Sequence, residues 1–394
     1  MKKRIGILCA GFIDWNGGLE FLKKTIIQPL LHGNKIYDNI EFYIIVPHVK
    51  KDIKVPFLIK RIGFLRKKYK KIKQSTISKK RNTSFDKYKK EAKIVFSDDL
   101  SKCVKKYKLD LLFPSIGILG KNFNSKWVGY LYDCQHKYYP QFFDKKEINA
   151  RNSYFQRMVD NSDKFIVNST DTKNDFIKFY KAKKSQVVNL PFAPLLNKEW
   201  LEKKPDLLKK YSLPKKYFII SNQFWIHKGH NTAFEALAKL KNKDIHIVCT
   251  GKMEDARDKN HINKLKTKIE KLGITNKIHF LGFIPKRDQI EILKNSLSII
   301  QPTLFEGGPG GGSIYDGVSL GLPCIISDLK VNKEVTGKNL FFFKVKSSTD
   351  LAKKMSDFLN KKITKPTKTK ILKQNKVFLE RLSKTLYEII QEKK

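Results

Sequence analysis

The chain has 394 residues, of which 41% are hydrophobic and 12% aromatic, which is enough for two domains with buried cores and argues against global disorder. Lys and Arg number 81 against 37 Asp and Glu, and the formal net charge is +44. A field of this sign attracts nucleic acid, anionic membranes and phosphorylated substrates. A Lys-rich composition without any such partner is the alternative, so the net charge alone does not identify a partner.

The five cysteines, at positions 9, 103, 134, 249 and 324, are far apart and form no Cys-x-x-Cys pair. This pattern fits buried thiols in a reducing compartment. The apolar run at the N-terminus is short and interrupted by glycine, which favours a first buried strand over a signal peptide. No apolar run approaches the ~20 residues that span a bilayer. We expect a cytoplasmic protein, and association with the inner face of the plasma membrane stays open.

In the first half of the chain, apolar segments of strand length alternate with segments of helical periodicity. This alternation predicts βα units and a parallel sheet. The predicted strands are residues 4–9, 40–47, 109–114, 127–132 and 164–168, and the predicted helices are residues 147–159 and 171–181.

Residues 50–93 depart from this pattern, because they carry dense runs of Lys and Arg with apolar residues between them. A basic amphipathic stretch can lie on anionic lipid, with about 1 kcal/mol per well-placed cation. We interpret the stretch as a basic insertion and a candidate membrane contact. A solvated loop without a partner is the alternative interpretation.

Four prolines between residues 189 and 214 indicate an interdomain linker, after which the strand and helix pattern starts again. We predict two doubly wound, Rossmann-like α/β domains that face a deep cleft, residues 1–195 and 196–370. A C-terminal helix over residues 371–394 would pack back on the first domain. In the second domain the predicted strands are residues 217–221, 245–250, 278–281, 297–302, 323–327 and 340–343, and the predicted helices are residues 232–240, 261–272, 287–295 and 314–320.

The strongest chemical signal is the segment FEGGPGGGSIYD at residues 305–316, between a predicted buried strand and a helix that we expect to begin near residue 313 or 314. Glycines let a backbone approach a ligand closely, and the free N–H groups at a helix start suit a phosphate. We therefore predict that Gly310, Gly311, Gly312 and Ser313 bind a phosphorylated ligand. A flexible surface loop is the alternative.

Two carboxylates flank this glycine-rich loop. Glu306 lies at its mouth, where it can accept hydrogen bonds from sugar hydroxyl groups, and Asp316 lies in the expected first helical turn, where it can reach a ribose. No pair of carboxylates with separable acid and base roles is evident, which argues against a glycoside hydrolase.

Three further segments follow predicted strands and should face the cleft, because ligands of open α/β sheets bind beyond the carboxyl ends of strands. Lys228 lies between the first strand and first helix of the second domain and can offset charge on a diphosphate. Gly17 and Gly18 follow the first strand of the chain. Asp133 and His136 follow the strand at 127–132 and are candidates for the acceptor side, although a lone His is often structural.

Together these segments resemble glycosyltransferase family 4, also called glycosyl transferases group 1, whose members have the GT-B fold and retain the anomeric configuration. The family's Gly-Gly-x-Glu loop is matched by Gly17 to Glu20, and its phosphate-binding Lys by Lys228. Gln223 stands where the family has an Arg, so that His227 or another cation would have to supply the missing charge. Glu306 matches the first Glu of the family's Glu pair.

The second Glu of that pair is absent in register, and Asp316 is its best substitute, in a loop longer by two residues. The resemblance implies a retaining hexosyltransferase that takes its sugar from a UDP- or GDP-linked donor without an obligatory metal or other cofactor. It implies catalytic roles for Lys228, Glu306 and His136, and donor contacts from Gln223 as well as from the glycine-rich loop.

The implied acceptor is a glycan or a lipid-linked oligosaccharide of bacterial surface polysaccharide or lipopolysaccharide synthesis. Two other functions stay open at this point. A sugar-nucleotide epimerase of similar fold would bind the same kind of donor. A basic nucleic-acid-binding protein fits the charge, but the sequence lacks a helix-turn-helix, zinc-finger or aromatic RNA-binding pattern, and we expect no nucleic acid partner.

Overall fold

The computed structural model describes residues 2–14, 16–37, 40–48, 85–202, 207–242, 244–361, 364 and 366–391. Most of the predicted basic insertion, residues 50–84, lies outside these ranges, and so does the membrane contact predicted for it. The last part of the insertion is described and is folded. Phe85 and Tyr88 are buried there, and a strand begins at Lys93.

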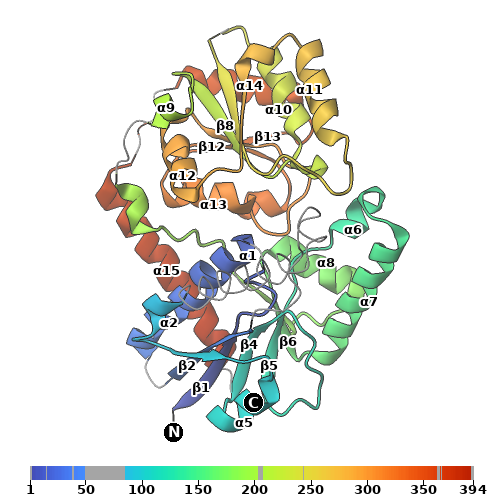
Figure 1. Ribbon diagram of the computed structural model, residues 1–394, viewed down its shortest axis with the longest axis vertical. Helices are drawn as coiled ribbons and strands as arrows, with labels where there is room; N and C mark the ends of the chain where they lie inside the picture. The colour runs from blue at the N-terminus through green and yellow to red at the C-terminus, as the bar shows by residue number, and fades with distance from the viewer. Residues whose placement is uncertain are drawn as a thin grey trace, which may run out of the picture. The chain divides into compact units, whose positions relative to one another are not determined.

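The first sheet has seven strands in the order β3-β2-β1-β4-β5-β6-β7 (Figure 1). The neighbouring pairs from β3 to β6 run parallel. Strands β1 (KRIGIL) and β2 (IEFYIIV) are buried along most of their length, as expected for a sheet covered on both faces. The strands are β1 (Lys3–Leu8), β2 (Ile40–Val46), β3 (Lys93–Phe96), β4 (Leu111–Ser115), β5 (Lys126–Tyr130), β6 (Lys164–Val167) and β7 (Val187–Asn189).

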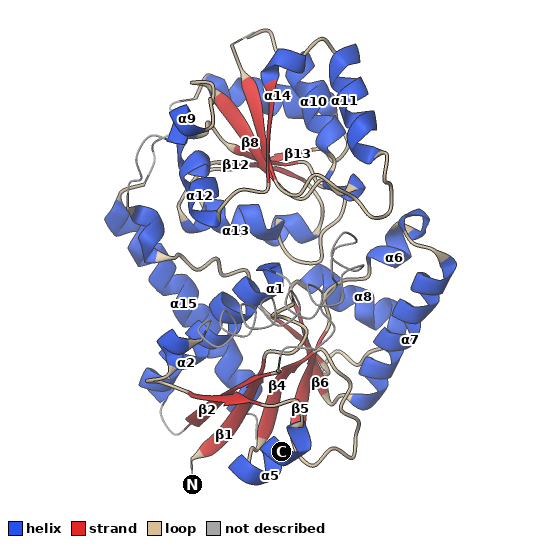
Figure 2. Ribbon diagram, viewed as in Figure 1, coloured by secondary structure: helices blue, strands red, loops and turns tan. Residues whose placement is uncertain are grey.

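The helices of this half connect the parallel strands (Figure 2). They are α1 (Asn16–Phe21), which continues through a π-helical turn (Leu22–Ile27) into α2 (Gln28–Tyr37), then α5 (Leu100–Tyr107), α6 (Gln135–Tyr138), α7 (Lys145–Asn161) and α8 (Thr170–Tyr180).

The second sheet has six strands in the order β10-β9-β8-β11-β12-β13, and every neighbouring pair is parallel. These strands are β8 (Tyr217–Ser221), β9 (His246–Thr250), β10 (Ile278–Gly282), β11 (Ile299–Gln301), β12 (Cys324–Ser327) and β13 (Leu340–Phe343). The helices are α9 (Leu207–Lys210), α10 (His230–Ala238), α11 (His261–Lys271), α12 (Lys286–Asn295), α13 (Gly311–Ser319), α14 (Ser348–Leu359) and α15 (Lys368–Gln391).

The core of the second sheet explains how its site helices are held. Apolar residues of α10, α11 and α14 form one buried cluster with the strands. Helix α13 packs very closely on the sheet, because a Cβ on Gly317 would lie 2.3 Å from Ile299 Cδ1 of β11. The start of α13 is therefore fixed at the carboxyl edge of the sheet, where parallel strands present their loops.

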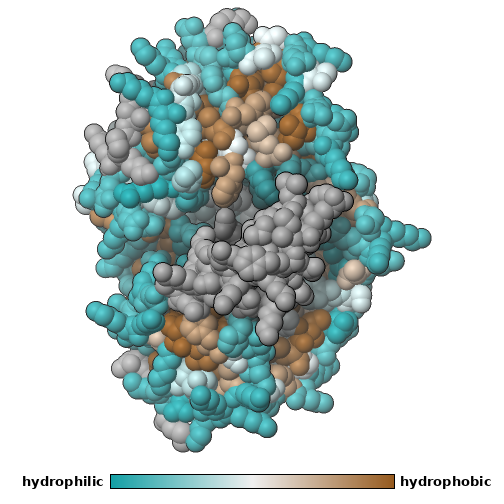
Figure 3. Space-filling model, in the orientation of Figure 1, coloured by the Kyte–Doolittle hydropathy of each residue, from teal (hydrophilic) through white to brown (hydrophobic). Residues whose placement is uncertain are grey.

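Contacts divide the chain into two compact units, which are Met1–Tyr130 with Arg157–Ile166 and Leu386–Lys394, and Leu131–Gln156 with Val167–Thr385. The end of α15 belongs to the first unit, where the Tyr387 hydroxyl donates to the Leu30 carbonyl at 3.3 Å. On the face drawn in Figure 3, hydrophilic residues cover most of the described surface, as a Lys-rich composition predicts. No helix in the described ranges is both long enough and apolar enough to cross a membrane.

Two parallel sheets with connecting helices confirm the predicted α/β class and its two Rossmann-like domains. The differences are local. The predicted segments did not include the short strands β3 and β7 or the helices α1, α2, α5, α6, α9 and α14, and α13 begins at Gly311 instead of residue 313 or 314. Gly311 and Gly312, which we predict in a loop, therefore lie in the first helical turn, and Asp316 lies in the second turn instead of the first.

Candidate functional site

The centre of the candidate site is an ion pair between Lys228 and Glu306. Lys228 ends a single 3-10 turn after β8, and Glu306 lies in the loop after β11. Because β8 and β11 are neighbouring parallel strands, their following loops meet at one edge of the sheet. Lys228 Nζ lies 2.6 Å from Glu306 Oε1, and the two side chains are only 13% and 10% exposed. The structure thus brings together Lys228, which the sequence predicted at the donor diphosphate, and Glu306, which it predicted at the donor sugar.

Gly229 explains how the two loops come so close. Its φ is +66°, a left-handed conformation that favours glycine, and a Cβ at this position would lie only 2.0 Å from the Pro302 carbonyl oxygen. The Leu304 amide donates to the His227 carbonyl at 2.7 Å across the same junction. A side chain at position 229 would therefore push the Lys228 loop away from the Glu306 loop.

The start of helix α13 lies in the glycine-rich loop. Gly310 is its N-cap, with φ +69° and no side-chain capping bond, and its own amide already donates to Asn332 Oδ1 at 2.9 Å. The next three amides, of Gly311, Gly312 and Ser313, occupy the first helical positions, which have no intrahelical acceptor. Gly312 is exposed, and a Cβ there would meet nothing within 4 Å. These three groups are therefore the ones suited to an anion.

Helix α10 has the same kind of start, with Gly229 as a left-handed N-cap and no side-chain cap. Helices α5, α8 and α14 are capped by Asp99, Ser169 and Ser347, whose side chains accept a backbone N–H bond, whereas α6, α11 and α12 also lack a side-chain cap. At α10 the Thr232 amide already donates to the Gly229 carbonyl at 3.0 Å, so fewer first-turn amides are open there than at α13. The helix dipole favours a negatively charged acceptor for the amides that remain.

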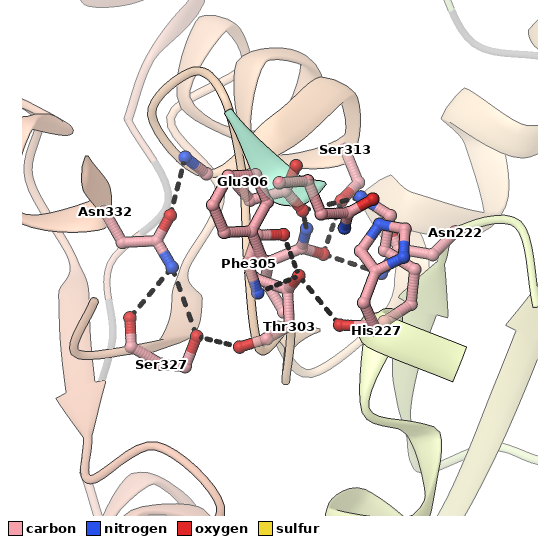
Figure 4. A network of polar contacts seen from close by, with 12 residues as sticks. Asn222, His227, Thr303, Phe305, Glu306, Ser313, Ser327 and Asn332 are labelled. Atoms are coloured by element: carbon pink, nitrogen blue, oxygen red, sulfur yellow. Dashed lines mark hydrogen bonds and ion pairs between the residues drawn. The ribbon is translucent and has the colours of Figure 1, made fainter. Parts of the chain in front are cut away.

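A buried polar network holds the glycine-rich loop (Figure 4). Asn332 Nδ2 donates to the Ser327 carbonyl at 2.9 Å, and the Ser327 hydroxyl donates to the Thr303 carbonyl at 2.7 Å. The Thr303 hydroxyl lies 3.2 Å from the His227 carbonyl. Asn332, Ser327 and Thr303 are all fully buried. The loop that carries Glu306 is thus tied to β12 on one side and to the Lys228 turn on the other.

The positive charge next to Lys228 comes from Arg257 and not from His227. Gln223, which replaces the family's Arg, is exposed. Burial, together with the charges of Lys228 and Arg257, lowers the pKa of His227 to about 2, so its imidazole is neutral near pH 7 and does not supply the missing charge. Arg257 is the nearby cation, with Nη2 3.1 Å from His227 Nδ1. That contact leaves the His227 proton on Nε2.

Arg257 is itself held by a carboxylate. Its Nε lies 3.0 Å from Asp255 Oδ1, and Asp255 Oδ2 also accepts from the Ile226 amide at 2.8 Å. Burial opposes ionisation of Asp255, but the hydrogen bonds from Arg257 and the backbone lower its pKa below the usual value. Asp255 therefore stays ionised and clamps the turn that presents Lys228.

Asp316, the predicted ribose ligand, is buried in the second turn of α13. Its carboxylate forms a short contact with the ammonium group of Lys286, at the start of α12. This partner could not be identified from the sequence, because Lys286 is one of many lysines. The ribose contact itself stays a prediction.

The two predicted acceptor-side residues differ in accessibility. His136 is 2% exposed, and its Nε2 lies 3.0 Å from Asn152 Oδ1 and 2.9 Å from the Tyr180 hydroxyl. Its Nδ1 has no hydrogen-bond partner among the described residues, and burial lowers the pKa of the ring. The imidazole is thus enclosed by protein, and its catalytic role stays a prediction.

Asp133 is half-buried and lies against the glycine-rich loop. A Cβ on Gly307 would lie 2.6 Å from the Asp133 Cβ, so the two backbones are in direct contact. Asp133 Oδ1 accepts from the Gln135 amide at 2.9 Å, while burial raises the pKa of the Asp133 carboxyl. The structure therefore places Asp133, rather than His136, beside this loop.

Gly17 and Gly18 lie in the first turn of helix α1 and not in a loop, which corrects the expected local structure. Gly17 is exposed and Gly18 is buried. They belong to the first compact unit, whereas Lys228 and Glu306 belong to the second. Their predicted donor contact stays a prediction.

Sequence reasoning missed several polar residues that shape the site, above all Gln301 and Asn222. Gln301 is fully buried at the end of β11, where it was interpreted as part of an apolar strand. A polar amide in such a run is the signal that could have identified it, because buried polar groups need partners. Within the described ranges, no three His, Cys, Asp or Glu side chains are grouped so that they could hold a metal ion.

Comparison with known proteins finds a family that the second half of the chain is similar to. Residues 204–376 match the model of the family Glycosyl transferases group 1. The match covers the second sheet with Lys228, Glu306 and the glycine-rich loop, and it supports a glycosyltransferase enzyme, as the sequence predicted. No curated protein matches the sequence.

Solved glycosyltransferases share the fold of the whole chain. A glycosyltransferase from Rickettsia africae is 19% identical, with a TM-score of 0.60 over 98% of this chain and 94% of the other. HepE from Anabaena, in complex with UDP and glucose, is 14% identical, with a TM-score of 0.60 over 98% and 95%. The lipopolysaccharide outer core galactosyltransferase WaaB is 15% identical, with a TM-score of 0.57 over 98% and 99%. These likenesses confirm the GT-B fold.

Proposed function

We propose that the protein is a retaining glycosyltransferase that moves a hexose from a UDP- or GDP-linked donor to a glycan or lipid-linked acceptor. The observation that carries the proposal is the Lys228–Glu306 pair, with Nζ and Oε1 2.6 Å apart, in a domain that matches glycosyl transferases group 1. The uncapped start of α13 adds backbone donors on the same side of Glu306, since a Cβ on Gly311 would lie 3.1 Å from Glu306 Oε1.

The proposed chemistry follows from where charge develops. When the bond between the anomeric carbon and the phosphate breaks, negative charge grows on the leaving diphosphate. Lys228 and the amides of Gly311 to Ser313 would stabilise this charge, and removal of one preorganised donor typically costs ~3–4 kcal/mol in the barrier. Glu306 would accept hydrogen bonds from donor sugar hydroxyls. We propose that these fixed groups serve without an obligatory metal, so that EDTA should leave the transfer rate unchanged.

The acceptor is proposed from the charge of the chain, its family and its fold relatives. HepE was solved with UDP and WaaB acts in the lipopolysaccharide outer core, which supports a UDP-sugar donor and a surface-polysaccharide acceptor. A net charge of +44 supports a lipid-linked acceptor at an anionic membrane face, with the protein cytoplasmic and peripheral.

The test is a screen of UDP- and GDP-sugars by thermal shift, followed by transfer assays with the donor that binds. A donor at 100-fold its Kd should stabilise the fold by roughly 2.7 kcal/mol. Product NMR should then show the anomeric configuration of the donor and no turnover without acceptor. An inverted product would contradict retention, and release of an epimerised donor without acceptor would contradict transfer.

A further inference from the structure

Gln301 is a buried amide whose hydrogen bonds all lead to the site. It is 0% exposed and ends the apolar strand β11. Its Nε2 donates to Glu306 Oε1 at 2.9 Å. Its Oε1 accepts from Asn222 Nδ2 at 2.7 Å and from the Ser313 hydroxyl at 3.2 Å. Figure 4 shows Asn222, Glu306 and Ser313 converging from three different segments. The hydrogen bonds of the Gln301 amide join these three residues.

The two sides of the amide have different partners, and this decides which residue types fit. On one side a donor is needed, because Glu306 Oε1 is an acceptor. On the other side an acceptor is needed, because Asn222 Nδ2 and the Ser313 hydroxyl both donate. Among side chains of this length, only the amide offers a donor and an acceptor together without taking up a proton. A carboxylate would meet Glu306 with like charge, and an apolar side chain would leave all three partners unsatisfied.

The contact fixes which oxygen of Glu306 is available. Oε1 accepts from both Lys228 Nζ and Gln301 Nε2, at 2.6 and 2.9 Å. Among the described residues, no group is hydrogen-bonded to Oε2. Gly311 preserves this arrangement, since a Cβ there would lie 3.1 Å from both Gln301 Nε2 and Glu306 Oε1. The first residue of α13 therefore packs directly on the bond between Gln301 and Glu306.

We propose that Gln301 is a positioning residue for transfer. Its amide holds the Glu306 carboxylate so that Oε1 pairs with Lys228 and Oε2 is left for a hydroxyl group of the donor sugar. The inference rests on the proposed function, because it assigns Glu306 to the sugar. It adds a residue to the catalytic arrangement and a physical reason for the amide at the end of β11.

The decisive variant is Gln301→Glu, which keeps the shape and replaces the donor with a carboxylate oxygen. Two carboxyl groups at hydrogen-bond distance cannot both ionise readily, so one of them takes up a proton as the pH falls. The shared proton restores a bond to Glu306 and removes the repulsion. The other oxygen of the new side chain still accepts from Asn222 and Ser313. We therefore expect activity relative to the native protein to be at least tenfold lower at pH 8 and to recover severalfold at pH 6.

The control is Gln289→Glu, because Gln289 is half-buried on α12 and its Nε2 contacts the Ser221 hydroxyl instead of a carboxylate. Its activity relative to the native protein should not change with pH. Gln301→Met is the second variant, since it removes the donor at every pH. It should lower kcat at least tenfold at both pH values while the affinity for the nucleoside diphosphate, measured by calorimetry with UDP and GDP, stays within threefold.

These readouts separate failure of the inference from failure of the proposed function. If the native protein transfers no sugar from any UDP- or GDP-linked donor, the proposed function fails before the variants are compared. If it does transfer, a pH-independent ratio for Gln301→Glu overturns the positioning role. Should Gln301→Glu not fold, native kcat in Gln301→Met overturns it, and a kcat loss with unchanged nucleotide affinity supports it.

Discussion

Replacement of Gly229 by Ala tests the close approach that joins Lys228 to Glu306. Gly229 and Gly273 have nearly the same backbone conformation, with φ values of +66° and +62°. An L-residue in this conformation costs roughly 1–2 kcal/mol at either position. The surroundings differ, because a Cβ at 229 would lie 2.0 Å from the Pro302 carbonyl oxygen, whereas a Cβ at 273 would meet nothing within 4 Å. Gly273→Ala is therefore a matched control for backbone strain.

The clash at position 229 sets the size of the expected effect. Cβ contacts below 3.0 Å are essentially never found, so the Lys228 loop and the Pro302 segment must separate by at least about 1 Å. The same shift would stretch the 2.6 Å contact of Lys228 with Glu306 beyond hydrogen-bond range. A displacement of about 1 Å in a catalytic arrangement can lower the rate by about a hundredfold.

The assay compares transfer kinetics and urea denaturation of both variants. We expect Gly273→Ala to lose roughly 1–2 kcal/mol of stability and to keep the native kcat. We expect Gly229→Ala to lose more stability and to have a kcat at least tenfold lower at a temperature where both variants are folded. Equal kcat values for the two variants would refute the claim that this close approach positions Lys228.

Further predictions concern charge and protonation. Lys228→Ala should lower kcat by ~10²–10³-fold while circular dichroism shows a folded protein, and a native rate would remove Lys228 from its proposed role. Burial lowers the pKa of His230 to about 3, so between about pH 6.5 and pH 3 the unfolded chain binds one more proton than the folded one. The contribution of His230 to the free energy of unfolding is therefore fully present above about pH 6.5 and decreases as the pH falls toward 3. His230→Phe, which keeps the stack on Phe224, should therefore match the native free energy of unfolding at pH 8. Between pH 8 and pH 5 its free energy of unfolding should fall by about 2 kcal/mol less than that of the native protein. An equal fall for the two proteins in urea denaturation would contradict this. Asp316→Ala should raise KM for the donor severalfold and change kcat little, and unaltered KM would argue against a ribose contact. The whole protein should bind anionic vesicles at low salt and release them at high salt, whereas absent or salt-independent binding would count against a membrane dock.

The fold was predictable because burial determines most of it. The strands at 217–221 and 340–343 were predicted to the residue, since each is an apolar run bounded by polar or turn-forming residues. Strands β3 and β7 were missed because they are only four and three residues long. The start of α13 was missed because glycine has a low helix propensity, yet here close packing on Ile299 fixes the helix.

The site was predictable only where topology brings residues together. Lys228 and Glu306 follow neighbouring parallel strands, so their proximity follows from the strand order. The partners of the site residues were not predictable in the same way. Lys286 pairs with Asp316, and Arg257 lies beside His227, through contacts between loops far apart in sequence. Nor does sequence reveal that the His136 ring is enclosed and bonded to Tyr180.

The central claim is that Lys228 and the start of α13 bind the diphosphate of a nucleotide-sugar donor. Calorimetric titration of UDP and GDP into the native protein and into Lys228→Ala tests it most directly. We predict that at least one of the two nucleotides binds the native protein and that its Kd rises at least tenfold in the variant. Absence of binding by both nucleotides, or equal affinity in the two proteins, would contradict the claim.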